Sequence, residues 1–170
     1  MRVAFQHKLA DLGEELVAMS TLTSQAMARA TRALLEADLA LAETVITEDE
    51  QINLRGRRCE QHACTLLALE APVAGDLRAV VSAIKVAEKI ERMGDLARHI
   101  AEITRMRHPE PVLPAELATP FSRMGRLATE AAQRIGEIRV DNGLVTRKPV
   151  EIGPGRLERS VEGGEVQIVG

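Results

Sequence analysis

Aromatic side chains are nearly missing from this sequence. Its 170 residues include no tryptophan, no tyrosine and only Phe5 and Phe121. Aromatic residues are typical of β-sheets, so their scarcity disfavours a sheet-based core. It also removes the platforms on which nucleic-acid bases stack, and a formal net charge of −3 provides no excess of basic groups for a phosphate backbone. We therefore expect no nucleic-acid partner.

Cysteine and long apolar runs are also scarce. Cys59 and Cys64 are five residues apart, so on a helix they point in different directions and form no CxxC pair. Two cysteines that form no pair favour a reducing, cytoplasmic compartment. We find no run of 18 apolar residues and no basic segment followed by an apolar one at the N-terminus. The sequence predicts neither export nor membrane spanning, and association with a membrane only at its periphery.

The residues that are present favour packed helices. The apolar fraction is 45% and is rich in alanine and leucine, at spacings of three and four residues. This pattern predicts helices over residues 3–36, from Asp38 as a cap to 70, from 75 or 76 to 107, and over 115–138. Pro72 and three prolines between 109 and 114 separate the last three. Because the turns are short, we predict an all-α fold, a bundle of long antiparallel helices.

An internal repeat and a change of composition divide the chain further. A shift of 105 residues aligns Leu117 with Leu12, Phe121 with Leu16 and Met124 with Met19, which predicts that the fourth helix repeats the first. From residue 140 to 170 the chain holds six glycines and two prolines, and apolar residues alternate over 166–169. A loop, a disordered segment and a short hairpin are all compatible with this tail.

Two acidic residues on the third predicted helix are the candidate site. Glu91 and Asp95 are four residues apart, so their carboxylates lie on one face of a helix, one turn from each other. They lie close to an apolar stripe formed by Leu77, Val81, Ile84 and Ala87. A solvated face, with each acid paired to a nearby base, is the simpler interpretation. Arg92 and Arg98 are such bases for Asp95, whereas Glu91 has none three or four residues away.

The predicted turn at Pro72 adds two more oxygen-bearing side chains. Asp49 lies 23 residues before Pro72, and Asp95 lies 23 residues after it. In an antiparallel helix pair these positions are level, so Asp49 and Asn53 can converge with Glu91 and Asp95 across one groove. Oxygen ligands suit magnesium, manganese or oxidised iron, and zinc if a histidine joins them. His99 continues the four-residue series, although a surface histidine is the simpler interpretation.

Three stretches of the sequence form a specific combination: DEQIN at 49–53, LLALEAPVAGDLR at 66–78 and ERMGDLARHIA at 91–101. Together they resemble the PhoU family of bacterial phosphate-transport regulators, and the resemblance covers roughly residues 2–138. It implies an all-helical fold of two similar three-helix repeats, with a metal ion bound through acidic E/D-xxx-D/N motifs. In this chain those motifs supply Glu91, Asp95, Asp49 and Asn53 as metal ligands, the ion being iron, zinc, manganese or magnesium.

The resemblance also implies a function and partners. It implies a negative regulator of phosphate uptake and of phosphate-starvation (Pho regulon) signalling, acting through metal-dependent contacts in the cytoplasm. The implied partners are the PstB-like ATPase subunit of the phosphate transporter and a PhoR-like sensor histidine kinase. A homo-oligomer, such as a homodimer, is also expected, because a three-helix repeat with one further helix leaves apolar surface uncovered. No enzymatic activity is expected, because the sequence carries no glycine-rich phosphate loop, GxSxG or HExxH motif.

The chain departs from the family pattern after the fourth helix. Its sequence predicts a PhoU-like three-helix repeat over 1–108, the first helix of an incomplete second repeat over 109–139 and an irregular tail over 140–170. We find no second copy of the acidic motifs, so one metal site is expected where the family has two. Two alternatives are a metal-binding helical adaptor without a phosphate role and a di-iron metalloenzyme. The second is weak, because no histidine follows a glutamate by three residues.

Overall fold

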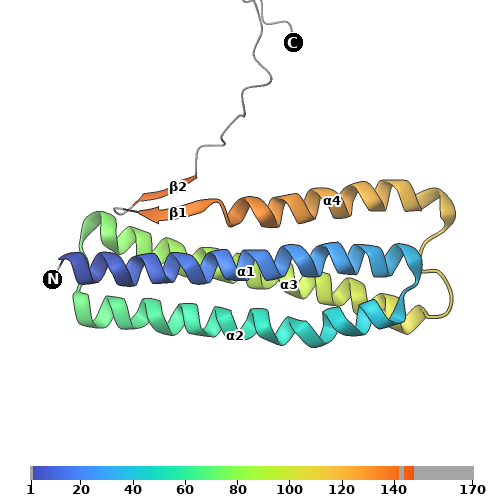
Figure 1. Cartoon of the computed structure of the whole chain (residues 1–170), viewed down its shortest axis with the longest axis horizontal. Coiled ribbons are helices and arrows are strands. Elements are labelled where there is room, and N and C mark those ends of the chain that lie inside the picture. Colours follow the sequence, from blue (N-terminus) through green and yellow to red (C-terminus); the bar gives the residue numbers. More distant parts are fainter. Residues whose placement is uncertain (1, 142–143, 148–170) are drawn as a thin grey trace, which may run out of the picture.

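Three long helices form the body of the protein. The computed structural model describes residues 2–141 and 144–147. Helices α1 (Arg2–Glu36), α2 (Leu39–Glu70) and α3 (Ala74–Arg107) pack side by side, and each runs antiparallel to the helix that follows it in the chain (Figure 1). Their bounds lie within two residues of those predicted, and the all-α bundle is confirmed.

The two tight turns between these helices have different chemistry. Asp38 caps α2 as predicted, because its Oδ1 accepts a hydrogen bond of 2.9 Å from the backbone N–H of Leu41. The turn into α3 has no such cap. Val73 takes that position without a side-chain hydrogen bond, and Asp76 lies inside the first turn of the helix. There its negative charge interacts favourably with the positive end of the helix dipole.

The core is built from large side chains on α1 and small ones on α3. Leu9, Leu12 and Met19 of α1 are fully buried, whereas the buried face of α3 is mostly alanine. The buried positions of α3 are Ala79, Val80, Ala83, Ala87, Ile90, Gly94, Ala97, Ala101 and Thr104. The predicted apolar stripe is therefore wrong in part, because Leu77 and Val81 are 41% and 37% exposed. Small residues allow α3 to approach its neighbours closely.

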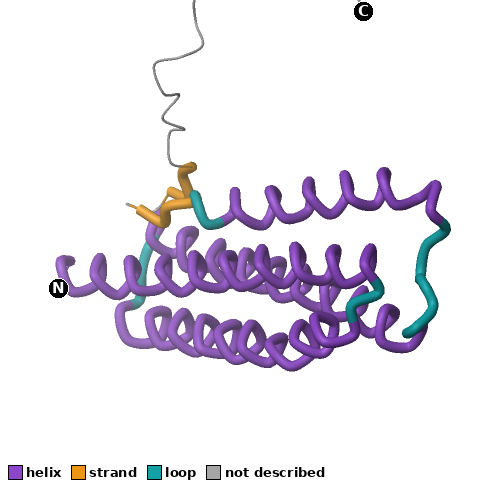
Figure 2. The backbone as a smooth tube through the Cα atoms, turned by 45° about the vertical axis from the view of Figure 1, so that its right-hand side comes forward, coloured by secondary structure: helices purple, strands orange, loops and turns teal. Residues whose placement is uncertain are grey.

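A fourth helix lies along α1. After a 3₁₀ turn at Ala115–Leu117, helix α4 (Ala118–Ile135) runs back beside α1, outside the three-helix body (Figures 1 and 2). The Ser20 hydroxyl of α1 donates a buried hydrogen bond of 2.7 Å to the backbone carbonyl of Ala132. The helix is shorter than the predicted 115–138, because its first residues form the 3₁₀ turn and residue 138 already belongs to a strand.

A β-hairpin follows α4. Strands β1 (Ile138–Asp141) and β2 (Leu144–Arg147) pair antiparallel, with Ile138 opposite Arg147. The hairpin contacts α1 and α3 and lies near the start of α1 (Figures 1 and 2). For the residues of these two strands, the structure shows the short hairpin, one of the three predicted alternatives for the tail. The prediction for 148–170, including the alternation at 166–169, lies outside the described residues, and the division into repeats stays a prediction.

None of the helices in the described part of the chain combines the length and the apolar character that crossing a bilayer requires.

Candidate metal centre

The predicted site residues lie where α2 and α3 face each other. Asp49 is buried on α2, with Asn53 one turn further along and partly buried. Glu91 and Asp95 are partly buried on α3. Arg98 of α3 forms ion pairs with both Asp49 and Asp95, so these two carboxylates lie close together, and Glu91 is one helical turn from Asp95. The antiparallel arrangement of α2 and α3 thus brings the two halves of the predicted site together.

Asp49 has one satisfied oxygen and one unsatisfied oxygen. Its Oδ2 accepts a hydrogen bond of 3.1 Å from the Asn53 side-chain amide and lies 3.2 Å from the Arg98 Nε. Its Oδ1 is buried and has no hydrogen-bond partner. Burial raises the pKa of Asp49, and the positive charge of Arg98 opposes this effect in part. A buried acceptor without a partner is costly, so this oxygen is a natural place for a cation.

Two glycines make room for the carboxylates. A Cβ added to Gly94 of α3 would lie 3.0 Å from the Ile52 Cδ1 and 3.6 Å from the Asp49 Oδ1, so α2 and α3 approach each other closely at Gly94. A Cβ added to Gly56 of α2 would lie 2.7 Å from the Glu91 Oε2. The sequence pattern did not predict this second contact. Gly56 and Glu91 are far apart in the chain, and a glycine within a helix carries no signal of what lies opposite it.

Glu91 is enclosed by this contact and by its acidic neighbours. Burial is the largest effect on the pKa of Glu91 and raises it. The negative charge of Asp95 raises this pKa further, and the positive charge of Arg57 lowers it. Glu60, which is exposed on α2, adds a smaller effect of the same sign as Asp95. The negative charge of Asp95 repels Asp49 and Glu91, and a cation that binds among the three acids relieves part of this repulsion.

Arg98 provides a positive charge inside this cluster. Its Nη2 lies 3.5 Å from the Asp95 Oδ1, which confirms the predicted pairing of these two residues. Its Nε reaches Asp49 on the opposite helix, and its Nη1 donates a hydrogen bond of 2.5 Å to the Glu102 Oε1. His99 is exposed beside it, with its Nε2 3.4 Å from the Arg98 Nη2.

Donor chemistry and present geometry differ in how well they suit a metal ion. Carboxylate oxygens and one amide fit a hard cation, and the unpartnered Asp49 Oδ1 offers it a ligand. In the described part of the chain, however, no three or more His, Cys, Asp and Glu side chains are arranged as a metal-binding cluster. Arg98 lies among the carboxylates in this arrangement. The residues therefore fit a cation in their chemistry, and the ligand set of Asp49, Asn53, Glu91 and Asp95 stays a prediction.

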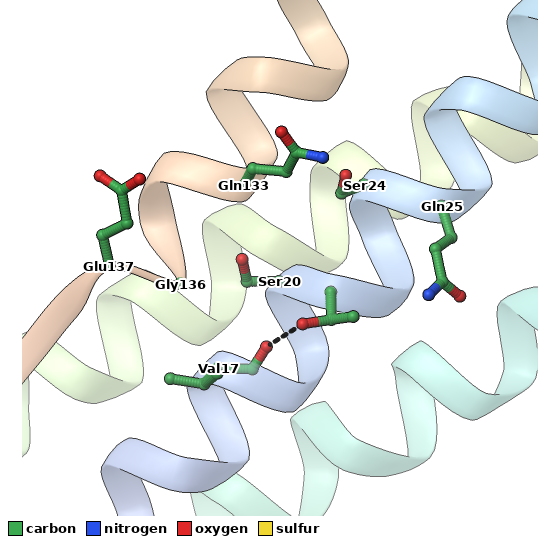
Figure 3. A pocket seen from close by; sticks show the side chains of 8 residues that line it. Val17, Ser20, Ser24, Gln25, Gln133, Gly136 and Glu137 are labelled. Carbon is green, nitrogen blue, oxygen red and sulfur yellow. Dashed lines mark hydrogen bonds between the residues drawn. The ribbon is translucent and has the colours of Figure 1, made fainter. Parts of the chain in front are cut away.

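A cavity between α1 and the end of α4 is a separate feature. Its volume is about 390 Å³, and Figure 3 shows Ser20, Ser24 and Gln133 around it. The Thr21 hydroxyl donates a hydrogen bond of 3.0 Å to the carbonyl of Val17 at its edge (Figure 3). Among the described residues, its lining includes Glu137 and no lysine, arginine or histidine. Such a lining is unsuited to an anion such as phosphate, and it contains none of the predicted site residues.

Comparison with known proteins identifies the family. The family model described as PhoU domain matches residues 16–104, which include all four predicted site residues. This chain belongs to the PhoU family. It is 51% identical over 138 residues to the phosphate-specific transport system accessory protein PhoU homolog 1 of Mycobacterium leprae, which covers 81% of this chain. Identity to PhoU homolog 2 of Mycobacterium tuberculosis is also 51% over 138 residues, with the same coverage of this chain.

A solved structure supports the same assignment. The chain is similar to the crystal structure of the phosphate transport system regulatory protein PhoU from Streptococcus pneumoniae, with a TM-score of 0.68 and 29% identity. The match covers 78% of this chain and 61% of that one. The chain spans 62% and 65% of the lengths of the two mycobacterial PhoU relatives.

Proposed function

We propose that this chain is a cytoplasmic regulatory protein of phosphate transport that lowers phosphate uptake and phosphate-starvation signalling. The named relatives are accessory and regulatory proteins of phosphate transport systems, which supports this role. The proposed partners are the ATPase subunit of a phosphate transporter and a sensor histidine kinase. The proposal requires binding and no catalytic step.

The observation that carries the metal-dependent part is the carboxylate cluster between α2 and α3. Asp49 is only 6% exposed, and its Oδ1 has no partner. Asp49, Glu91 and Asp95, together with Asn53, would hold a divalent or ferric ion. A bound ion would supply positive charge that neutralises the carboxylates and cross-links α2 to α3. The proposal is that partners recognise the bundle when the two helices are held in this way.

Metal content and partner capture test this function. We expect the purified chain to retain a divalent or ferric ion after dialysis, and to capture both proposed partners from extract of phosphate-replete cells. The double substitution Glu91→Ala with Asp95→Ala should abolish the bound metal, as measured by mass spectrometry, and weaken both captures. Asp76→Ala with Glu88→Ala is the matched control, because it removes two acids of the same helix outside the cluster.

The outcomes separate the parts of the proposal. Equal metal content in the wild type and in the Glu91/Asp95 variant would contradict the site. Metal binding without capture of either partner would contradict the phosphate role and leave a metal-binding adaptor.

Self-association is the last part of the proposal. Helix α4 exposes Met124 and Leu127, and the 3₁₀ turn before it exposes Leu117. The repeat aligns Leu117 and Met124 with Leu12 and Met19, which the core buries completely. In the described part of the chain, α4 packs mainly on α1 and has no second helical layer comparable to α2 and α3. We propose that a second copy of the chain covers this face and forms a homodimer.

A further inference from the structure

We propose that Arg98 is the residue that sets the affinity and the charge selectivity of the carboxylate cluster for cations. Its guanidinium lies among the carboxylates that a metal ion would use, so an incoming cation has to displace it. This inference rests on the proposed metal-dependent function. It adds that the Arg98 guanidinium of the same chain competes with the metal ion for the carboxylates.

Three contacts hold the guanidinium in place. Its Nε lies 3.2 Å from the Asp49 Oδ2 on α2, its Nη2 lies 3.5 Å from the Asp95 Oδ1, and its Nη1 bonds the Glu102 Oε1 at 2.5 Å. Guanidinium is planar, carries five N–H donors and keeps its charge at any physiological pH. It therefore neutralises carboxylates from both helices as a bound cation would.

The unsatisfied oxygen of Asp49 shows that this neutralisation is incomplete. The ion pair of Arg98 with Asp49 is made to Oδ2, whereas Oδ1 is buried near Gly94 and has no hydrogen-bond partner. Arg98 approaches Asp49 from one side and does not satisfy both oxygens. The Asp49 Oδ1 has lone pairs that the guanidinium does not use and that a metal ion could bind. When a metal ion replaces the guanidinium, Asp49 loses its contact with Arg98 and gains a metal contact at Oδ1.

The displaced side chain has somewhere to go. Glu102 lies four residues after Arg98 on the same helix, and it forms the shortest of the three contacts. Arg98 is also 29% exposed at its side chain, so it can leave Asp49 toward solvent while it keeps Glu102 as its partner. Displacement thus breaks the contacts with Asp49 and Asp95 and preserves the third.

Charge selectivity follows from the competition. Replacing one guanidinium by one sodium or potassium ion leaves the total charge among the carboxylates unchanged. Binding of a monovalent ion is therefore little favoured by electrostatics. A divalent or ferric ion adds positive charge where Asp49, Glu91 and Asp95 repel one another. Arg98 therefore excludes monovalent cations and weakens binding of the others.

Calorimetric titration of the metal-free full chain with Mn²⁺ tests the inference. We expect Arg98→Met, which keeps an apolar stem and removes the charge, to bind Mn²⁺ about tenfold or more tightly than the wild type. Arg92→Met is the matched control, because Arg92 is exposed on the same helix and its loss changes the net charge equally. We expect the control to bind with wild-type affinity.

The results separate this inference from the proposed function. Equal Mn²⁺ affinity in the wild type and in Arg98→Met would overturn the role of Arg98 and leave the metal site intact. A tenfold gain in Arg92→Met as well would overturn it too, because net charge alone would then explain the change. Absence of binding in the wild type and in Arg98→Met would overturn the metal-dependent function itself.

A thermal readout and a second variant guard against misfolding. Arg98→Met leaves the buried Asp49 without its cation, so its metal-free melting temperature should fall below that of the wild type and Mn²⁺ should raise it further than in the wild type. If this variant does not fold, Arg98→Lys replaces it. An ammonium group keeps the charge but does not span three carboxylates, so we expect a several-fold gain in Mn²⁺ affinity. Wild-type affinity in Arg98→Lys would then overturn the inference.

Discussion

Asp49 shows at the scale of one residue how burial and charge oppose each other. Its carboxylate is nearly removed from water, and Arg98 and Asn53 compensate only one of its two oxygens. The position of the carboxylates could be predicted from the sequence. Residues four apart share one face of a helix, and residues at equal distances from the turn at Pro72 lie side by side on α2 and α3. The contact from Arg98 to Asp49 could not be predicted, because it depends on the path of a long side chain across two helices.

Removing the charge of Asp49 should change the pH dependence of stability. Burial raises the pKa of Asp49 above its ordinary value of 3.8, so the folded state binds this proton more tightly than the unfolded state does. The free energy of unfolding therefore falls as pH rises from about 3.8 through the folded pKa. We expect metal-free Asp49→Asn to be more stable than the wild type at neutral pH, with the difference shrinking in acid.

Urea denaturation of the metal-free protein across this pH range measures the effect. Asp11→Asn, at an exposed position of α1, is the control and should follow the wild-type curve. A stability difference that grows as the pH is lowered would contradict the expected sign.

At the scale of elements, the helix ends were predictable because each has a local chemical cause. Asp38 and Pro72 marked the first two turns, and both were confirmed. The buried face of α3 was misplaced, because its large apolar residues Leu77 and Val81 are partly exposed and alanines form the contact surface. Hydrophobic periodicity gives little weight to alanine, so a face built for close approach is harder to recognise than one built from leucine.

The two glycines of the site should respond differently to an added methyl group. In Gly56→Ala the new Cβ meets the flexible end of Glu91, and alanine is favoured over glycine within a helix by up to about 1 kcal/mol. We expect stability within about 1 kcal/mol of the wild type and weaker Mn²⁺ binding, because Glu91 has to move.

Gly94→Ala is the matched comparison. Its Cβ would meet the Ile52 Cδ1 at 3.0 Å and its Cγ2 at 3.3 Å inside the core. Overpacking of this kind costs about 1–3 kcal/mol, so we expect this variant to lose stability in chemical denaturation. Wild-type Mn²⁺ affinity in Gly56→Ala, measured by calorimetry, would contradict the placement of Glu91 at the site.

At the scale of the whole molecule, the fourth helix is the least enclosed. Met124 is 60% exposed and Leu127 is 50% exposed, on a helix that packs mainly on α1 in the described part of the chain. The sequence repeat aligned Met124 with Met19, which is buried on α1. It did not predict that Met124 and Leu127 would be exposed, because periodicity shows which face is apolar and not which element covers it.

This exposure predicts the oligomeric state. We expect the wild type to elute as a dimer in size-exclusion chromatography with light scattering, and Met124→Glu with Leu127→Glu to shift it to monomer. Thr119→Glu with Ser122→Glu adds the same charge at exposed positions of α4 outside the apolar face, and should stay dimeric. A monomeric wild type at tens of micromolar would contradict the proposed interface.

The central position of α1 has a consequence for how the native state opens. Helix α1 packs against α2, α3 and α4, whereas α4 depends mainly on α1. Detaching α4 breaks one interface and leaves the three-helix body in place, while loosening α1 breaks three interfaces together. Backbone amides of α4 are therefore released by a low-energy partial unfolding, and those of α1 exchange with solvent only when the whole bundle opens.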